Sequence, residues 1–93
     1  MPKASPANYA INFSAQALRK LRKLKSDQAV LKSIWKTIDT LKIDPRKNGA
    51  EKLANSESMR IRDGSYRIVF DINDSNRIVT VQNIADRKDV YRQ

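Results

Sequence analysis

The side chains best suited to chemistry in this sequence are arginines on two neighbouring segments of alternating polarity. Apolar and polar residues alternate along residues 59–62 and again along 66–72, and the pair Asp63-Gly64 between them is typical of a two-residue β-hairpin turn. With this turn, Arg60 lies directly opposite Arg67, on the face away from the apolar side chains. Two opposed guanidinium groups repel each other by up to about 1 kcal/mol, whereas an anion between them would meet two planar forks of donors. We therefore predict an anion site on this face; the alternative is two solvated arginines that splay apart.

The next strand extends this polar face. Residues 73–76 mark a second turn, which can hold two or four residues, and residues 77–84 are apolar enough for a central strand. If Ile72 pairs with Arg77, then Gln82 lies beside Arg67 on the open face. The resulting surface is concave, cationic and polar, and it suits a phosphate backbone.

The tail of the sequence carries a tyrosine among basic residues. Tyr91 follows Arg87 by four positions and precedes Arg92. Its role can be structural, with a packed ring and a solvated hydroxyl. It can also be chemical, because a phenol has a pKa of about 10 and neighbouring cations lower it by stabilising the phenolate. The sequence contains no His, so Tyr91 is one of few groups able to exchange a proton near neutral pH.

These side chains require a scaffold, and the first half of the chain predicts two helices. A short strand at residues 9–13 leads to Ser14, which is a suitable N-cap for a first helix. Ser26 or Asp27 restarts the chain into a second helix, and Pro45 ends it. Both helices are amphipathic and closely joined, so they should form an antiparallel hairpin.

The order of elements, β-α-α-β-β-β, predicts an α+β domain in which the N-terminal helical hairpin packs on one face of an antiparallel sheet. The apolar stripe of the second helix includes Trp35, which we predict to be a core residue. Residues 46–58 have the signals of a loop. We expect residues 1–93 to form a single domain, with residues 1–7 as a flexible tail.

Charge indicates what the protein binds. Lys and Arg number 19 and Asp and Glu number 10, so the formal net charge is +9, and the expected partners are polyanions. The densest basic run is either a solvated helix face or a binding surface, and it consists of Arg19, Lys20, Arg22, Lys23 and Lys25.

Composition also excludes classes of function. Without His or Cys there is no thiol nucleophile, no imidazole base and no metal site with nitrogen or sulfur ligands, and the acidic residues do not cluster. We therefore expect neither a metal nor a cofactor. No apolar stretch approaches the roughly 20 residues of a membrane helix, and residues 1–8 lack the apolar segment of a signal peptide. These features predict a cytoplasmic protein with no membrane partner.

Taken together, these segments resemble the RelE/ParE superfamily of bacterial toxins. The strongest matches are residues 59–70 (MRIRDGSYRIVF) and 84–92 (IADRKDVYR), and residues 9–14, 41–45 and 52–53 support them. The matches follow in the right order and span nearly the whole chain. The resemblance implies the toxin of a type II toxin–antitoxin pair, with a cognate RelB-like antitoxin that presents an acidic, partly disordered segment.

RelE-like members of the superfamily cleave mRNA in the ribosomal A site without a metal ion, and the resemblance to that branch implies a ribosome-dependent mRNA endonuclease. Arg67, Arg87 and Tyr91 match its catalytic pattern. The two arginines would stabilise charge on the phosphoryl oxygens. Tyr91 would remove the proton of the RNA 2′-hydroxyl, or stack on an RNA base.

Other residues match positions that would hold RNA phosphates. Arg60 and Arg62 match two positions that are usually lysine in the best-known RelE type, and Lys52 matches a loosely kept Lys-Leu pair. Because arginine keeps its proton, Arg60 and Arg62 can replace only the charge of those lysines. The general acid therefore has no assigned residue.

Two other functions are open to a chain of this kind. ParE-like members of the superfamily inhibit DNA gyrase without the nuclease residues, and a basic domain can also bind RNA without any catalysis. The set Arg67, Arg87 and Tyr91 favours the nuclease, because a gyrase inhibitor does not need it. The basic run at residues 19–25 would then bind ribosomal RNA or the antitoxin.

Overall fold

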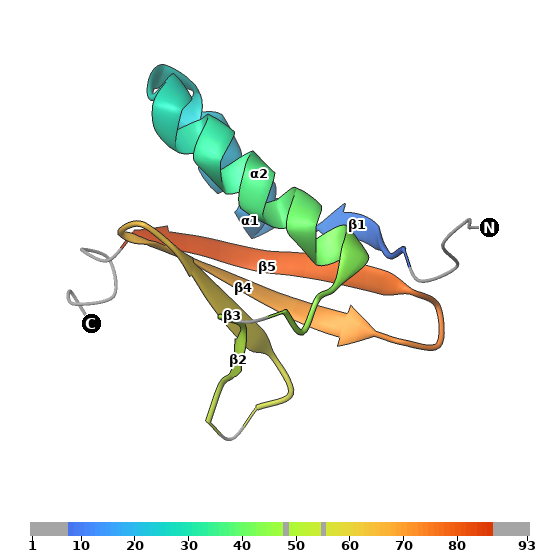
Figure 1. The fold of residues 1–93 in the computed structure, drawn as a ribbon. Coiled ribbons are helices and arrows are strands. Elements are labelled where there is room, and N and C mark those ends of the chain that lie inside the picture. Colours follow the sequence, from blue (N-terminus) through green and yellow to red (C-terminus); the bar gives the residue numbers. More distant parts are fainter. Residues whose placement is uncertain (1–7, 48, 55, 87–93) are drawn as a thin grey trace.

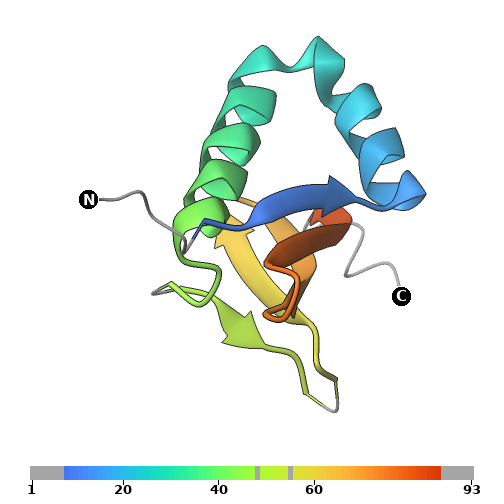
Figure 2. The same cartoon turned by 90° about the vertical axis from the view of Figure 1, so that its right-hand side faces the viewer.

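The computed structural model describes residues 8–47, 49–54 and 56–86, which form two α-helices and a five-stranded sheet. Both helices lie on one side of the sheet, and the opposite side carries no helix of the described chain (Figure 1; Figure 2). The predicted α+β class and helical hairpin are thereby confirmed. In chain order the elements are β1 (Ala10–Phe13), α1 (Ala15–Lys23), the 3₁₀ turn η1 (Leu24–Ser26), α2 (Gln28–Ile43), β2 (Glu51–Lys52), β3 (Met59–Asp63), β4 (Tyr66–Asn73) and β5 (Ile78–Asp86).

The helices begin and end where the sequence predicts. The Ser14 hydroxyl accepts a hydrogen bond from the Ala17 N–H (3.0 Å) at the start of α1, and the Asp27 carboxylate accepts one from the Val30 N–H (3.2 Å) at the start of α2. These caps satisfy donors that have no partner inside the helix. The second helix stops just before Pro45, which cannot donate to the next turn.

The sheet is mixed, and this corrects the prediction of an antiparallel sheet. The strand order is β1-β5-β4-β3-β2, and β1 runs parallel to β5 while the other pairs are antiparallel. A parallel pair requires a long crossover between its strands, and the helical hairpin and three strands provide that length. The short edge strand β2 lies within the segment that was predicted to be a loop.

The core lies between the helical hairpin and the sheet. Its helical members lie one turn apart, and its strand members alternate along β3, β4 and β5. The buried residues are Ala17, Leu21, Leu24, Ile34, Ile38, Leu41, Ile61, Ile68, Phe70, Val79, Val81 and Ile84.

Trp35 was predicted to be a core residue, and this is wrong: it is 40% exposed. The stripe of α2 that faces the sheet is centred on Ile34 and Ile38, so Trp35 lies at its margin. Its ring instead meets the Phe13 ring edge to face, with centroids 5.4 Å apart.

The first hairpin has a different register from the one predicted. Its turn is Gly64-Ser65, and Arg62 rather than Arg60 lies opposite Arg67. Glycine adopts positive φ without strain, and Gly64 has φ +62° at the first turn position. Ser65 at the second position does not have positive φ, which matches a type II′ turn and not type I′. The shift moves each partner by two residues, so every side chain keeps its predicted face.

The second hairpin also differs from the prediction. Ile72 pairs with Val79 instead of Arg77, and a four-residue turn at 74–77 joins the strands. A bulge beside Val69 and Phe70 leaves Gln82 as an extra residue of β5.

Candidate functional site

The open face of the sheet carries an arginine pair at the end near the β3–β4 turn. Arg62 on β3 and Arg67 on β4 are direct cross-strand partners. Arg67 is half-buried and Arg62 is exposed. Within the described ranges, neither guanidinium is paired with an acidic side chain. The pair is therefore a site of concentrated positive charge, with the forked donors that bind phosphate.

Arg60 lies on the same face but in a different electrostatic setting. It is opposite Val69 on β4 and opposite Glu51 on β2. Its Nε and Nη2 donate to Glu51 Oε1 at 3.3 and 3.1 Å. The predicted Arg60–Arg67 pair is thus wrong, because the register places Arg62 there and gives Arg60 an acidic partner. Glu51 fixes the position of Arg60 and offsets its charge.

A polar cluster that the sequence analysis missed continues the open face beyond the arginines. The Ser58 hydroxyl donates to one carboxylate oxygen of Asp71, and Gln82 Nε2 donates to the other at 2.7 Å. All three side chains are half-buried. Gln82 lies on the predicted face, but its predicted place beside Arg67 is wrong: the bulge and the shifted register place Ala85 opposite Arg67, and the Gln82 amide is bonded to Asp71 instead. Asp71 could have been found from the sequence, because it lies four residues after Arg67 in an alternating strand.

Lys52 is not brought together with the arginines. It pairs with Met59, so its side chain lies on the helix side of the sheet. The Lys52 Nζ is 3.7 Å from Glu57 Oε2, and both side chains are exposed.

The predicted residues Arg87 and Tyr91 lie outside the described residues. The strand that precedes them ends beside the arginine pair, because Ala85 pairs with Arg67 and Asp86 pairs with Tyr66.

The basic run is divided between a groove and the open surface. Arg19, Lys20 and Lys23 line a groove of about 330 Å³ between α1 and the last part of β5. Arg22 and Lys25 are exposed and do not line this groove. The run therefore presents cations along the edge of the sheet, at the end where β5 approaches Arg67.

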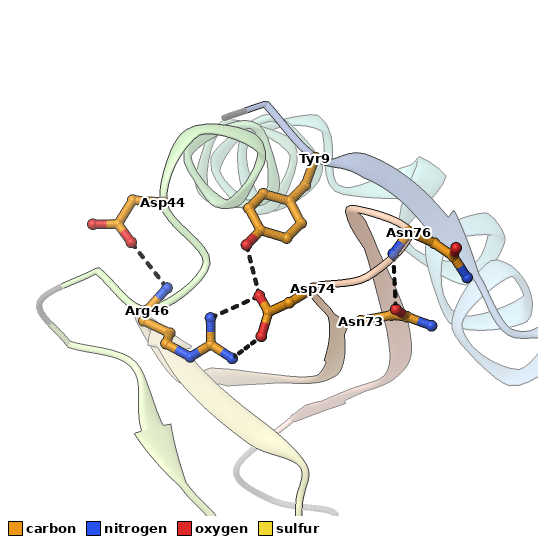
Figure 3. A network of polar contacts seen from close by, with 6 residues as sticks. All are labelled: Tyr9, Asp44, Arg46, Asn73, Asp74 and Asn76. Atoms are coloured by element: carbon orange, nitrogen blue, oxygen red, sulfur yellow. Dashed lines mark hydrogen bonds and ion pairs between the residues drawn. The ribbon is translucent and has the colours of Figure 1, made fainter. Parts of the chain in front are cut away.

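A second network joins the start of β1 to two connecting segments at the opposite end of β4 and β5 (Figure 3). Arg46 donates to both carboxylate oxygens of Asp74 at 3.1 and 2.9 Å, and the Tyr9 hydroxyl donates to Asp74 Oδ1 at 2.7 Å. The bonds from Arg46 and Tyr9 lower the pKa of Asp74. The bond to Asp74 raises the pKa of Tyr9, and the same carboxylate raises the pKa of Arg46. These three residues form a clasp between β1, the α2–β2 connection and the β4–β5 turn.

No group of three or more acidic, His or Cys side chains in residues 8–47, 49–54 and 56–86 could hold a metal ion. No helix in those ranges is long and apolar enough to cross a membrane.

A known protein family matches most of the sequence. The model of the ParE toxin of the type II toxin–antitoxin system parDE matches residues 11–91. No curated protein sequence matches the chain.

Solved toxin structures share this fold. The toxin–antitoxin complex RelBE2 from Mycobacterium tuberculosis matches with a TM-score of 0.77 and 22% identity, over 91% of this chain and 98% of that one. The intact RelBE complex from E. coli matches with a TM-score of 0.71 and 27% identity, over 84% and 95%. A YoeB/ParE toxin from Agrobacterium tumefaciens matches with a TM-score of 0.75 and 16% identity, over 83% and 96%.

Proposed function

This chain belongs to the ParE toxin family of type II toxin–antitoxin systems, within the RelE/ParE superfamily, and from that premise we propose that it is a ribosome-dependent mRNA endonuclease. The observation that carries the proposal is the Arg62–Arg67 pair. A sheet selected only for stability would not oppose two arginines that have no acidic partner in the described part of the chain, since the repulsion costs up to about 1 kcal/mol. A phosphate between them would offset that cost.

The proposed reaction is an attack within the RNA chain. The 2′-oxygen forms a bond to the adjacent phosphorus, and the bond from phosphorus to the 5′-oxygen breaks, which leaves a cyclic phosphate and a 5′-hydroxyl. Arg67 and Arg87 stabilise the negative charge that builds on the phosphoryl oxygens. Tyr91 removes the proton of the 2′-hydroxyl or orients an RNA base by stacking.

The remaining charges bind RNA on either side of the reacting phosphate. Arg60 and Arg62 hold flanking phosphates, and Glu51 keeps the Arg60 fork in a fixed orientation. Arginine keeps its proton at neutral pH, so the proton for the leaving 5′-oxygen comes from water or from the ribosome. No metal ion takes part in this scheme.

The partner that silences the toxin is a cognate antitoxin. The similar structures from Mycobacterium tuberculosis and E. coli described above are complexes of a toxin with its antitoxin, which supports such a partner here. The groove beside Arg19, Lys20 and Lys23 suits an acidic antitoxin segment, and ribosomal RNA is the other polyanion that can contact it.

Inhibition of DNA gyrase is the second candidate function. It is favoured by the family model, which describes the ParE toxin of parDE. This reading gives no role to the Arg62–Arg67 pair. A basic module that binds RNA without catalysis is the third, and it predicts no arrest of growth.

One experiment separates the nuclease, the gyrase inhibitor and the RNA-binding module. The wild type and Arg67→Ala are expressed from an inducible promoter, and primer extension maps cleavage of a translated reporter mRNA. The nuclease reading requires cleavage within codons that depends on translation and disappears in Arg67→Ala. Intact mRNA in arrested cells would move the assignment to gyrase. Intact mRNA with normal growth would contradict both toxin activities.

A further inference from the structure

We propose that Asp71, held by Ser58 and Gln82, reads a guanine base of the RNA bound to the arginines. The inference rests on the proposed nuclease function, because it places a nucleotide on the same open face. It goes beyond that function by assigning a base preference to three residues of the polar cluster.

The register places Asp71 within reach of a nucleotide bound by the arginines. Arg67 and Asp71 project from the same face of β4 and are four residues apart, or roughly 13 Å along the strand. Arg60 lies opposite Val69, midway between them. It is therefore a diagonal neighbour of Asp71, with backbones roughly 7–8 Å apart. A phosphate at Arg60 can thus place its own base over the polar cluster.

The chemistry of the cluster suits a base and opposes a phosphate. A carboxylate repels phosphate oxygens, so no phosphate group of the bound RNA lies at Asp71. A carboxylate accepts N–H donors, which bases present on their edges. Phosphate contacts position a nucleic acid, whereas contacts to base edges select its sequence.

The orientation of the carboxylate favours guanine among the four bases. Ser58 and Gln82 each occupy one acceptor position on a different oxygen of Asp71, which fixes its plane and leaves a second position on each oxygen. The Watson–Crick edge of guanine carries two adjacent donors, N1–H and N2–H, which match two carboxylate oxygens. Adenine, cytosine and uracil each place an acceptor beside their donor, and that acceptor would face the negative charge of Asp71.

Asp71→Asn tests the assignment in the cell. The amide keeps the shape of Asp71, and Ser58 and the Gln82 amide can each donate or accept, so both hydrogen bonds can form in the variant. Asp39→Asn is the matched control, since Asp39 is an exposed acid on α2 that pairs with Lys42. Thermal unfolding of all three proteins establishes that the variants are folded.

Cleavage mapped on translated reporter mRNA should concentrate in the wild type at codons with guanine at one fixed position. In Asp71→Asn the ratio of cleavage at guanine to cleavage at other bases should fall about tenfold, while cleavage continues. Asp39→Asn should keep the wild-type pattern. An unchanged pattern in Asp71→Asn, a wild-type pattern that ignores guanine, or a folded Asp71→Asn that cleaves nowhere would each overturn the inference.

A binding measurement separates failure of the inference from failure of the nuclease. Nucleoside 5′-monophosphates are added to isotope-labelled toxin, and the NMR signals of Asp71 and the Gln82 side chain are followed. GMP should shift these signals more than AMP, CMP or UMP, and the difference should disappear in Asp71→Asn. Absence of mRNA cleavage together with GMP selectivity would reject only the nuclease. Equal shifts by all four nucleotides would reject the guanine site.

Discussion

At the scale of single residues, the three described arginines of the open face differ in what surrounds them. Arg60 forms an ion pair with Glu51, whereas Arg62 and Arg67 are direct cross-strand partners of each other. Like charges directly opposite each other in a sheet are destabilising, and under the proposed function a phosphate bound between the two arginines would offset that cost. Residues kept for function commonly reduce stability in this way.

Replacement of Arg62 by Gln should therefore change stability and activity in opposite directions. We expect the free energy of unfolding to rise by up to about 1 kcal/mol, because the repulsion with Arg67 is removed. We expect mRNA cleavage to fall about tenfold, because a charged hydrogen bond to phosphate is lost. Urea denaturation and primer extension measure the two effects. Lys36→Gln on the exposed side of α2 removes the same charge and is the control, and a less stable Arg62→Gln protein would contradict the argument.

At the scale of elements, Ser14 is the junction that fixes β1, α1 and β5 together. Its hydroxyl accepts from the Ala17 N–H and also donates to the Gln82 carbonyl at 2.7 Å. Its own N–H donates to the Val81 carbonyl at 2.9 Å. A single residue thus starts the first helix and continues the pairing of β1 with β5.

Ser14→Ala should accordingly destabilise the protein more than loss of an ordinary cap. We expect a loss of about 2 kcal/mol in the free energy of unfolding, since both the cap and the bond to Gln82 disappear. Asp27→Ala is the matched control: Asp27 caps α2 through the Val30 N–H, and its loss should cost about 1 kcal/mol. Chemical denaturation of both variants tests this, and equal losses would show that the bond to Gln82 contributes nothing.

The clasp of Tyr9, Arg46 and Asp74 gives the fold a dependence on pH. Arg46 and Tyr9 lower the pKa of Asp74 below its usual 3.8. The Asp74 carboxylate therefore contributes to the stability of the fold above pH 3.8, and this contribution is lost as the pH falls through the pKa of Asp74 in the folded protein. The pKa of Tyr9 is raised above 10.0. The protonated Tyr9 hydroxyl therefore contributes to stability below pH 10.0, and this contribution is lost as the pH rises through the pKa of Tyr9 in the folded protein.

Asp74→Asn should remove the acid part of this dependence. We expect the variant to melt at a lower temperature than the wild type at pH 6, because it loses the charge that pairs with Arg46. The difference should be only a few degrees, because the clasp is exposed and screened by solvent. The difference should shrink as the pH is lowered below about 3.8, where the wild type loses the same charge. Thermal unfolding from pH 6 to pH 2.5 measures it, and a constant difference across that range would contradict this role.

At the scale of the whole molecule, charge is distributed over two surfaces that approach the same end of the sheet. The arginines occupy the open face, and Arg19, Lys20 and Lys23 line the groove between α1 and β5. With a net charge of +9, the protein should associate with polyanions at a rate and affinity that fall with salt.

Reversing the charge at two groove positions tests the second surface. Arg19→Glu combined with Lys23→Glu should weaken binding to the antitoxin or to the ribosome at low salt, with a difference that narrows as salt rises. Lys32→Glu combined with Lys36→Glu changes the net charge equally on exposed positions of α2 and should have a smaller effect. Binding titrations at several salt concentrations supply the comparison. Unchanged affinity for both partners at low salt would refute a role for the groove.

The sequence by itself determined the two helices, four of the five strands, and the face of each side chain in the hairpin of β3 and β4. Caps at Ser14 and Asp27, the stop at Pro45 and the two hydrophobic periods are local signals, and each acts within a few residues of the chain. For the same reason the open, cationic face was predictable, since alternation assigns Arg60, Arg62 and Arg67 to one side in any register that keeps the core buried.

Only the tertiary structure decided what faces what across the sheet. The predicted turn at Asp63-Gly64 and the observed one at Gly64-Ser65 bury the same apolar residues, and the backbone of Gly64 selects between them. The parallel pairing of β1 with β5, the exposure of Trp35, and the partners of Arg60 and Asp71 depend on segments far apart in the chain. Such contacts are set by the packing of whole elements, and local periodicity carries no information about them.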